Sequence, residues 1–104
     1  MSRIASKMKL LAGFEAEYKK RHDEIWPKLS TLLKESGISK YSIFLDKETN
    51  ILFGVMEVDD PKALENLPLH PVMKRWWAHM KDIMDSNADY SPVSTPLEEI
   101  FYLP

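Results

Sequence analysis

The chain has 104 residues, which is enough for one domain and too few for two ordinary ones. Its 44% hydrophobic and 29% charged residues are typical of a folded protein rather than a disordered one, and its net charge of -2 argues against a nucleic-acid-binding protein. It contains no cysteine, which excludes disulfides and thiolate metal sites. Residues 1–104 are therefore expected to form a single domain.

The N-terminal residues lack the apolar core of a signal peptide, and no run approaches the roughly 20 apolar residues that cross a bilayer. We therefore expect a cytoplasmic protein. A chain of this length buries only a modest core, so pairing with a second copy is a natural way to bury more surface.

Alternating apolar and charged residues predict a strand from Arg3 to Leu11. After Gly13, helical periodicity extends from Phe14 to Glu35. Pro27 interrupts this helix, because proline lacks the backbone N–H and disfavours a helical conformation at the preceding residue. We expect a kink or a break there, and a left-handed cap at Gly37.

His22 lies within or at the edge of the apolar stripe of this helix, one turn after Tyr18. An imidazole in such a place is partly desolvated and titrates near neutral pH. It is either a histidine at the edge of the core, satisfied by a hydrogen bond, or a functional group. The stripe itself consists of Phe14, Tyr18, Ile25, Leu29, Leu32 and Leu33.

Two apolar runs, Tyr41–Leu45 and Ile51–Val58, flank a polar segment and predict a β-hairpin. Both faces of these strands carry apolar residues, so both faces should be covered. Helices can cover one face, and a ligand, a partner or both must cover the other.

A short helix is predicted from Lys62 to Asn66, and a longer one from Pro71 to Met84 whose apolar stripe is too wide for a single packing seam. Residues 85–92 have the composition of a loop, and Ile100–Leu103 is predicted as a last strand. This order of elements indicates the α+β class, with a ferredoxin-like sheet carrying helices on one face. The uncovered face could serve a homodimer, in which two sheets close into a barrel-like sandwich.

Three features could carry chemistry. Tyr18 and His22 point the same way from their helix, as a hydroxyl and an imidazole for general acid–base catalysis must. Trp76 and Trp77 differ by about 100° in direction, so one can pack inside while the other borders a cavity and offers a flat face to a sugar; both could equally fill the core. Tyr41 belongs to the site only if its side chain lies on the same face of the sheet as Tyr18 and His22. A shift of one residue in the pairing register of its strand would place it on the other face.

Other kinds of site find little support. The histidines at 22, 70 and 79 lack metal-ligand spacing, and the three glycines are too far apart for a phosphate-binding loop. The methionines suit the filling of core gaps better than a cofactor site.

Four separated motifs resemble the L-rhamnose mutarotase family, and the resemblance covers nearly the whole chain. The four motifs that carry the resemblance are Tyr18-x-x-Arg21-His22-x-x-Ile25-Trp26-Pro27, Arg75-Trp76-Trp77-x-x-Met80-x-Asp82-x-Met84, Ser91-Pro92-Val93 and Phe101-Tyr102-Leu103-Pro104. Two places depart from the family's pattern: Leu64–Pro68 lacks a tryptophan-containing helix, and Tyr90 stands where asparagine is expected.

The resemblance implies a homodimeric α+β barrel that interconverts the anomers of L-rhamnose without a cofactor. It also implies that His22 is the proton donor and that Tyr18, Tyr41, Trp76 and Trp77 contact the sugar. Two alternatives remain from the residues and the fold class alone. One is a non-catalytic module that binds a small ligand, and the other is a barrel oxygenase.

Overall fold

The structure is a computed structural model, and it describes residues 2–104. Four antiparallel strands form one sheet in the order β2-β3-β1-β4. The strands are β1 (Ser2–Lys9), β2 (Ile38–Asp46), β3 (Ile51–Val58) and β4 (Ser94–Leu97). The helices are α1 (Glu15–Asp23), α2 (Pro27–Glu35), η1 (Pro61–Leu69, a 3-10 helix) and α3 (Pro71–Met80).

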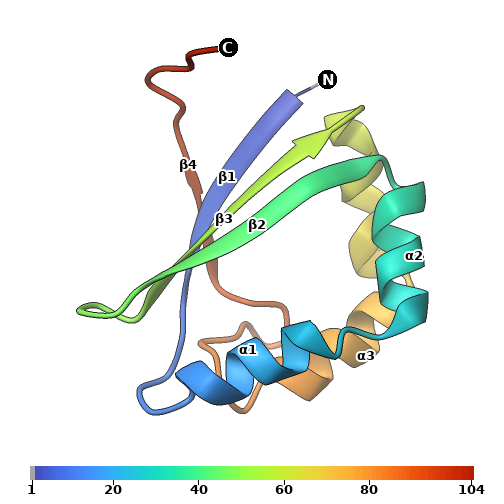
Figure 1. Cartoon of the computed structure of the whole chain (residues 1–104). Helices are drawn as coiled ribbons and strands as arrows, with labels where there is room; N and C mark the ends of the chain where they lie inside the picture. The colour runs from blue at the N-terminus through green and yellow to red at the C-terminus, as the bar shows by residue number, and fades with distance from the viewer. Residues whose placement is uncertain (1) are drawn as a thin grey trace.

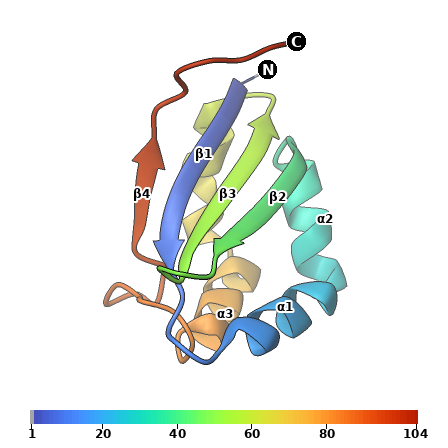
Figure 2. The same ribbon diagram turned by 60° about the vertical axis from the view of Figure 1, so that its left-hand side comes forward.

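The helices lie on one face of the sheet (Figure 1). In Figure 2 the strands stand in front of η1, and no helix of residues 2–104 lies on the near face of the sheet. This arrangement is the predicted ferredoxin-like α+β fold. No helix within residues 2–104 is long and apolar enough to span a membrane.

The predicted break in the first helical segment is confirmed. Helix α1 ends at Asp23, and Trp26 has extended backbone angles (φ -61°, ψ 132°) before Pro27 opens α2. Proline suits the first position of a helix because the N–H that it lacks would have no partner there. Gly37 ends the second helix with a positive φ of 84°, as predicted.

The core lies between the sheet and the helices. Its most buried side chains come from the region after β1, α2, β3 and the turn after α3: Leu10, Leu29, Leu52, Val58 and Ile83, each at most 1% exposed. Helix α3 is shorter than predicted, because the chain turns after Met80 and Met84 instead forms a β-bridge with Leu10. Asp85 donates its backbone N–H to the carbonyl oxygen of Lys9, so the loop at residues 85–92 begins beside the end of β1.

The prediction of a last strand at Ile100–Leu103 is wrong. The fourth strand is Ser94–Leu97, which pairs with β1 in a register that sets Ala5 opposite Leu97. Continued along β1, this register would set Ile100 opposite Ser2, the first residue of that strand, so Tyr102 and Leu103 lie beyond the strand. The apolar tail therefore runs past the sheet (Figure 2).

Candidate active site

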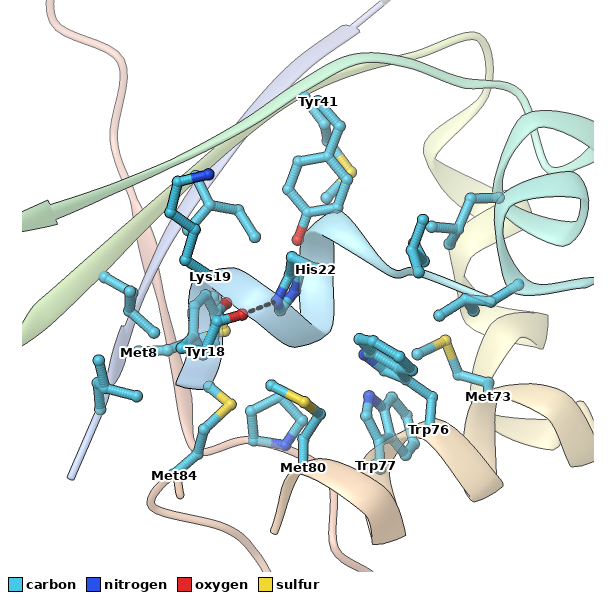
Figure 3. Close-up of a pocket in the computed structure, with 18 of the residues that line it drawn as sticks. Met8, Tyr18, Lys19, His22, Tyr41, Met73, Trp76, Trp77, Met80 and Met84 are labelled. Carbon is cyan, nitrogen blue, oxygen red and sulfur yellow. Dashed lines mark hydrogen bonds between the residues drawn. The ribbon is translucent and has the colours of Figure 1, made fainter. Parts of the chain in front are cut away.

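A cavity of about 1060 Å³ lies between the helix-covered face of the sheet and the helices. All five predicted site residues line it: Tyr18, His22, Tyr41, Trp76 and Trp77. Figure 3 shows that Tyr18 and His22 come from α1, Tyr41 from the sheet above them, and the two tryptophans from α3. Groups that lie far apart in the sequence therefore converge on one space.

Tyr18 and His22 form a stacked pair on α1. Their ring centroids are 4.2 Å apart, with an angle of 28° between the ring planes. Tyr18 is 8% exposed and belongs to the core cluster, whereas His22 is half-buried. The one-turn spacing of the two residues thus places an imidazole at the boundary between core and cavity.

The imidazole of His22 is held by its own helix. Its Nδ1 lies 3.0 Å from the backbone carbonyl oxygen of Tyr18. A carbonyl oxygen can only accept a hydrogen bond, so we assign the proton of the neutral ring to Nδ1. Nε2 is then the nitrogen that gains or loses a proton, and within residues 2–104 no hydrogen bond occupies it. This geometry leaves Nε2 for a molecule in the cavity.

Burial controls the titration of the three polar groups. It lowers the pKa of His22, an effect that the hydrogen bond to Tyr18 and the charge of Asp23 oppose in part. Burial raises the pKa of Tyr18, helped by the nearby Tyr41, and burial also raises the pKa of Tyr41. Both phenols therefore stay protonated at neutral pH and can donate hydrogen bonds.

Tyr41 faces the cavity, which settles the choice that its strand pattern left open. Its side chain is still 40% exposed, because it borders the open part of the cavity rather than the packed core. Figure 3 shows its hydroxyl pointing toward the α1 residues.

The two tryptophans divide as their 100° separation predicts. Trp76 is 6% exposed and packs edge-on against His22, with ring centroids 5.4 Å apart, and against Trp26 at 5.1 Å. Trp77 is half-buried and borders the cavity. Trp76 thus packs in the core and also lines the cavity, whereas Trp77 mainly lines the cavity.

Two supporting residues were not singled out from the sequence. Arg21 donates to both carboxylate oxygens of Asp82, at 2.9 and 3.2 Å, and to the backbone carbonyl oxygen of His79, at 2.6 Å. It ties α1 to the end of α3. Trp26 completes the aromatic cluster behind Trp76. The only sequence signal for either residue was that it belongs to the same motif as His22.

The two departures from the family pattern both lie at the cavity. Leu64, Leu67 and Pro68 from the 3-10 helix line one part of it, and Tyr90 lines another. Tyr90 has a positive φ of 71°, a conformation that asparagine adopts more readily than tyrosine. An aromatic ring therefore stands at this part of the cavity wall.

Within residues 2–104, no group of three or more His, Asp or Glu side chains is placed to hold a metal ion.

Comparisons with known proteins agree with this geometry. The L-rhamnose mutarotase family model matches residues 3–103. An L-rhamnose mutarotase of Agrobacterium fabrum is 59% identical over 104 residues, covering 100% of this chain and 97% of that protein. The crystal structure of an L-rhamnose mutarotase from Formosa agariphila covers 100% of both chains at 49% identity, with a TM-score of 0.93. A conserved protein from Methanosarcina mazei shares the fold alone, at 16% identity over 93% of this chain and 90% of that one, with a TM-score of 0.63. The chain therefore belongs to the L-rhamnose mutarotase family.

Proposed function

We propose that this protein is an L-rhamnose mutarotase that interconverts the α and β anomers of the sugar. Family membership supports the reaction, and one observation supports its location. His22 presents a free ring nitrogen to a cavity that has phenols on one side and indoles on the other. General acid–base catalysis of ring opening needs such a group within reach of the sugar's oxygens.

In this proposal His22 acts as the proton donor. When the ring is protonated on both nitrogens, its Nε2–H gives a proton to the ring oxygen of the sugar, while the anomeric hydroxyl loses its proton to water in the open part of the cavity. The bond between the ring oxygen and the anomeric carbon breaks, which leaves the open-chain aldehyde. After rotation about the first carbon–carbon bond, the hydroxyl that held the ring attacks the other face of the aldehyde and returns its proton to Nε2. The aldehyde oxygen takes a proton back from water, which gives the other anomer.

The aromatic residues would hold the sugar. Tyr18 and Tyr41 carry protonated phenols that can donate to sugar hydroxyls. Trp76 and Trp77 offer apolar surface for the C–H face of the ring and for the C6 methyl group of a 6-deoxy hexose. No electrons or chemical groups are transferred between molecules in this reaction, so we expect it to need no cofactor.

We further propose that the working unit is a homodimer formed through the sheet face that the helices leave open. The register places Phe44 opposite Phe53 on that face. It also places Ala5 between Val55 of β3 and Leu97 of β4. Phe44 is 62% exposed and Leu97 is 37% exposed. A contiguous apolar patch of this kind is typical of an interface, and a second copy would cover it sheet against sheet.

Polarimetry tests the reaction. Freshly dissolved crystalline L-rhamnose changes its optical rotation slowly in buffer. The protein should raise the rate of that change by an amount proportional to the protein concentration. Binding of the sugar without faster relaxation would instead support a non-catalytic binding module. If the protein neither binds L-rhamnose nor speeds its relaxation, the proposal that this sugar is its substrate is wrong.

A further inference from the structure

The orientation of Tyr41 depends on an irregularity in β2. The strand pairing passes from Ser39 opposite Glu57 to Ser42 opposite Val55, so that Lys40 and Tyr41 together face a single residue of β3. This is a β-bulge, and bulges redirect side chains. Ile38 packs in the core, and simple alternation from it would send Tyr41, three residues on, to the outer face. The extra residue returns Tyr41 to the cavity.

Lys40 provides the unusual backbone of the bulge. Its φ is +48°, in the left-handed region that residues other than glycine seldom adopt. Such a conformation persists only where surrounding contacts hold it.

Glu57 provides such a contact from the outer face of the sheet. Its side chain is 15% exposed, with Oε1 3.5 Å from the Arg3 guanidinium and Oε2 3.6 Å from the Lys40 ammonium. Oε2 is shielded from solvent and has no hydrogen-bond partner within residues 2–104. A shielded carboxylate oxygen is costly without a nearby positive charge, so Glu57 favours the backbone conformation that keeps Lys40 close.

Gly54 leaves room for the redirected ring on the cavity side. A Cβ atom at this position would lie 3.5 Å from Cε1 of Tyr41 and 3.7 Å from its hydroxyl oxygen. Those are ordinary contact distances, so alanine fits, whereas the further carbons of a larger side chain would meet the phenol.

We propose that Glu57 is a positioning residue that acts through the Lys40 bulge to aim Tyr41 into the cavity, with Gly54 leaving the space that the phenol occupies. This inference rests on the proposed function, because Tyr41 is the group that would hold a sugar hydroxyl. Glu57 itself lies on the opposite face of the sheet from the cavity and does not contact the substrate.

The test is a double-mutant cycle on KM and kcat for anomer exchange. Glu57→Gln should raise KM several-fold and change kcat less, because a misdirected Tyr41 weakens sugar binding. The same change in a Tyr41→Phe background should have almost no further effect, since residues that act through one another are not additive. Glu99→Gln is the matched control: it also removes a carboxylate partner of Arg3, with no contact to Lys40, and should leave KM unchanged.

A second readout does not depend on activity. In protein labelled with ¹³C-tyrosine, the Tyr41 signal, assigned by its absence in Tyr41→Phe, should shift in Glu57→Gln and not in Glu99→Gln. Gly54→Val should shift the same signal more than Gly54→Ala does. Additive effects in the cycle or an unmoved Tyr41 signal would overturn the positioning role. Native protein without anomer exchange would instead overturn the proposed function, and the signal shift would still decide the role of Glu57.

Discussion

His22 gains its chemical character from a single helical turn. The backbone carbonyl oxygen of Tyr18, one turn earlier, accepts a hydrogen bond from Nδ1–H at 3.0 Å and so leaves Nε2 to exchange protons. Partial burial lowers the pKa of the ring. The imidazolium is then a minor species at neutral pH, but it is a stronger acid than an exposed histidine.

This low pKa predicts the pH dependence of the reaction. The protonated donor is lost as the pH rises through the pKa of His22, which lies below the usual value of about 6.5. The rate of anomer exchange per enzyme should therefore be highest at the acidic end of a series from about pH 5 to pH 8 and should fall as the pH rises. Saturation-transfer NMR at each pH measures it, with His22→Gln as the control that lacks this transition. A rate that rises through the same transition would make His22 a base instead.

The two tryptophans should respond differently to truncation. Trp76→Ala removes a 6% exposed side chain and should lower the free energy of unfolding by about 3–5 kcal/mol, as large core truncations do. Trp77→Ala should cost much less stability and should mainly raise KM for the sugar, since Trp77 borders the cavity. Urea denaturation and sugar titrations measure the two effects. If sugar binding is unchanged in both variants, the two tryptophans only fill the core and do not hold the sugar.

At the scale of elements, α1 must be held against α3 for His22 to meet Trp76. Arg21 makes this connection through Asp82 and the carbonyl of His79. The bond to Asp82 raises the pKa of Arg21 and lowers the pKa of Asp82, so both groups stay charged across the neutral range. Asp82 is well exposed, however, so solvent weakens the attraction between them.

Arg21→Met keeps most of the apolar length of the side chain and removes its hydrogen bonds. It should lower the free energy of unfolding by about 1–2 kcal/mol, a range set by bonds to charged groups and reduced by exposure. It should also lower kcat, because α1 carries His22. Lys19→Met is the matched control: Lys19 pairs with Asp23 at 2.7 Å on the surface of the same helix, and its loss should leave the urea midpoint almost unchanged. Equal effects of the two changes would contradict the role given to Arg21.

Local rules predicted some elements and missed others. Pro27 predicted the helix break because its effect on the backbone is confined to neighbouring residues. Tyr41 faces the cavity because of a bulge at Lys40, and the alternation of apolar and polar residues does not predict where a bulge occurs. The fourth strand was missed because all four residues of Ser94–Leu97 are exposed, so no apolar pattern marks them, while the apolar residues after it lie beyond the end of β1.

The candidate site was predicted more fully than the sheet. The one-turn spacing of Tyr18 and His22 and the divergence of Trp76 and Trp77 are helical geometry, which sequence spacing determines. The orientation of the imidazole and the tie from Arg21 depend on tertiary packing. Neither could be predicted from spacing alone.

At the scale of the whole molecule, the sheet separates two surfaces. One face forms the cavity with the helices, and the other presents the apolar patch around Phe44 and Val55. The Arg3–Glu57–Lys40 cluster lies beside that patch, on the outer face. A second copy docked there would also limit the solvent around the groups that position Tyr41.

Phe44→Asp should break the proposed dimer. It places a charge on the open face, where Phe44 is 62% exposed in one chain and would be buried against a second. Analytical ultracentrifugation should show the native protein at twice the mass of one chain and the variant at the mass of one chain. Lys47→Gln, in the turn after β2, lowers the net charge by the same one unit and should leave the dimer intact. A monomeric native protein would contradict the dimer.

The central claim is that His22 catalyses exchange between the two anomers of L-rhamnose. The most direct measurement is saturation-transfer NMR at equilibrium, in which one anomeric proton is saturated and the signal of the other is followed. Native protein should transfer saturation readily, and a folded His22→Ala variant should lose roughly 10²–10⁴-fold in exchange rate. Transfer that is no faster with the native protein than in buffer, or equally fast with His22→Ala, would contradict the account.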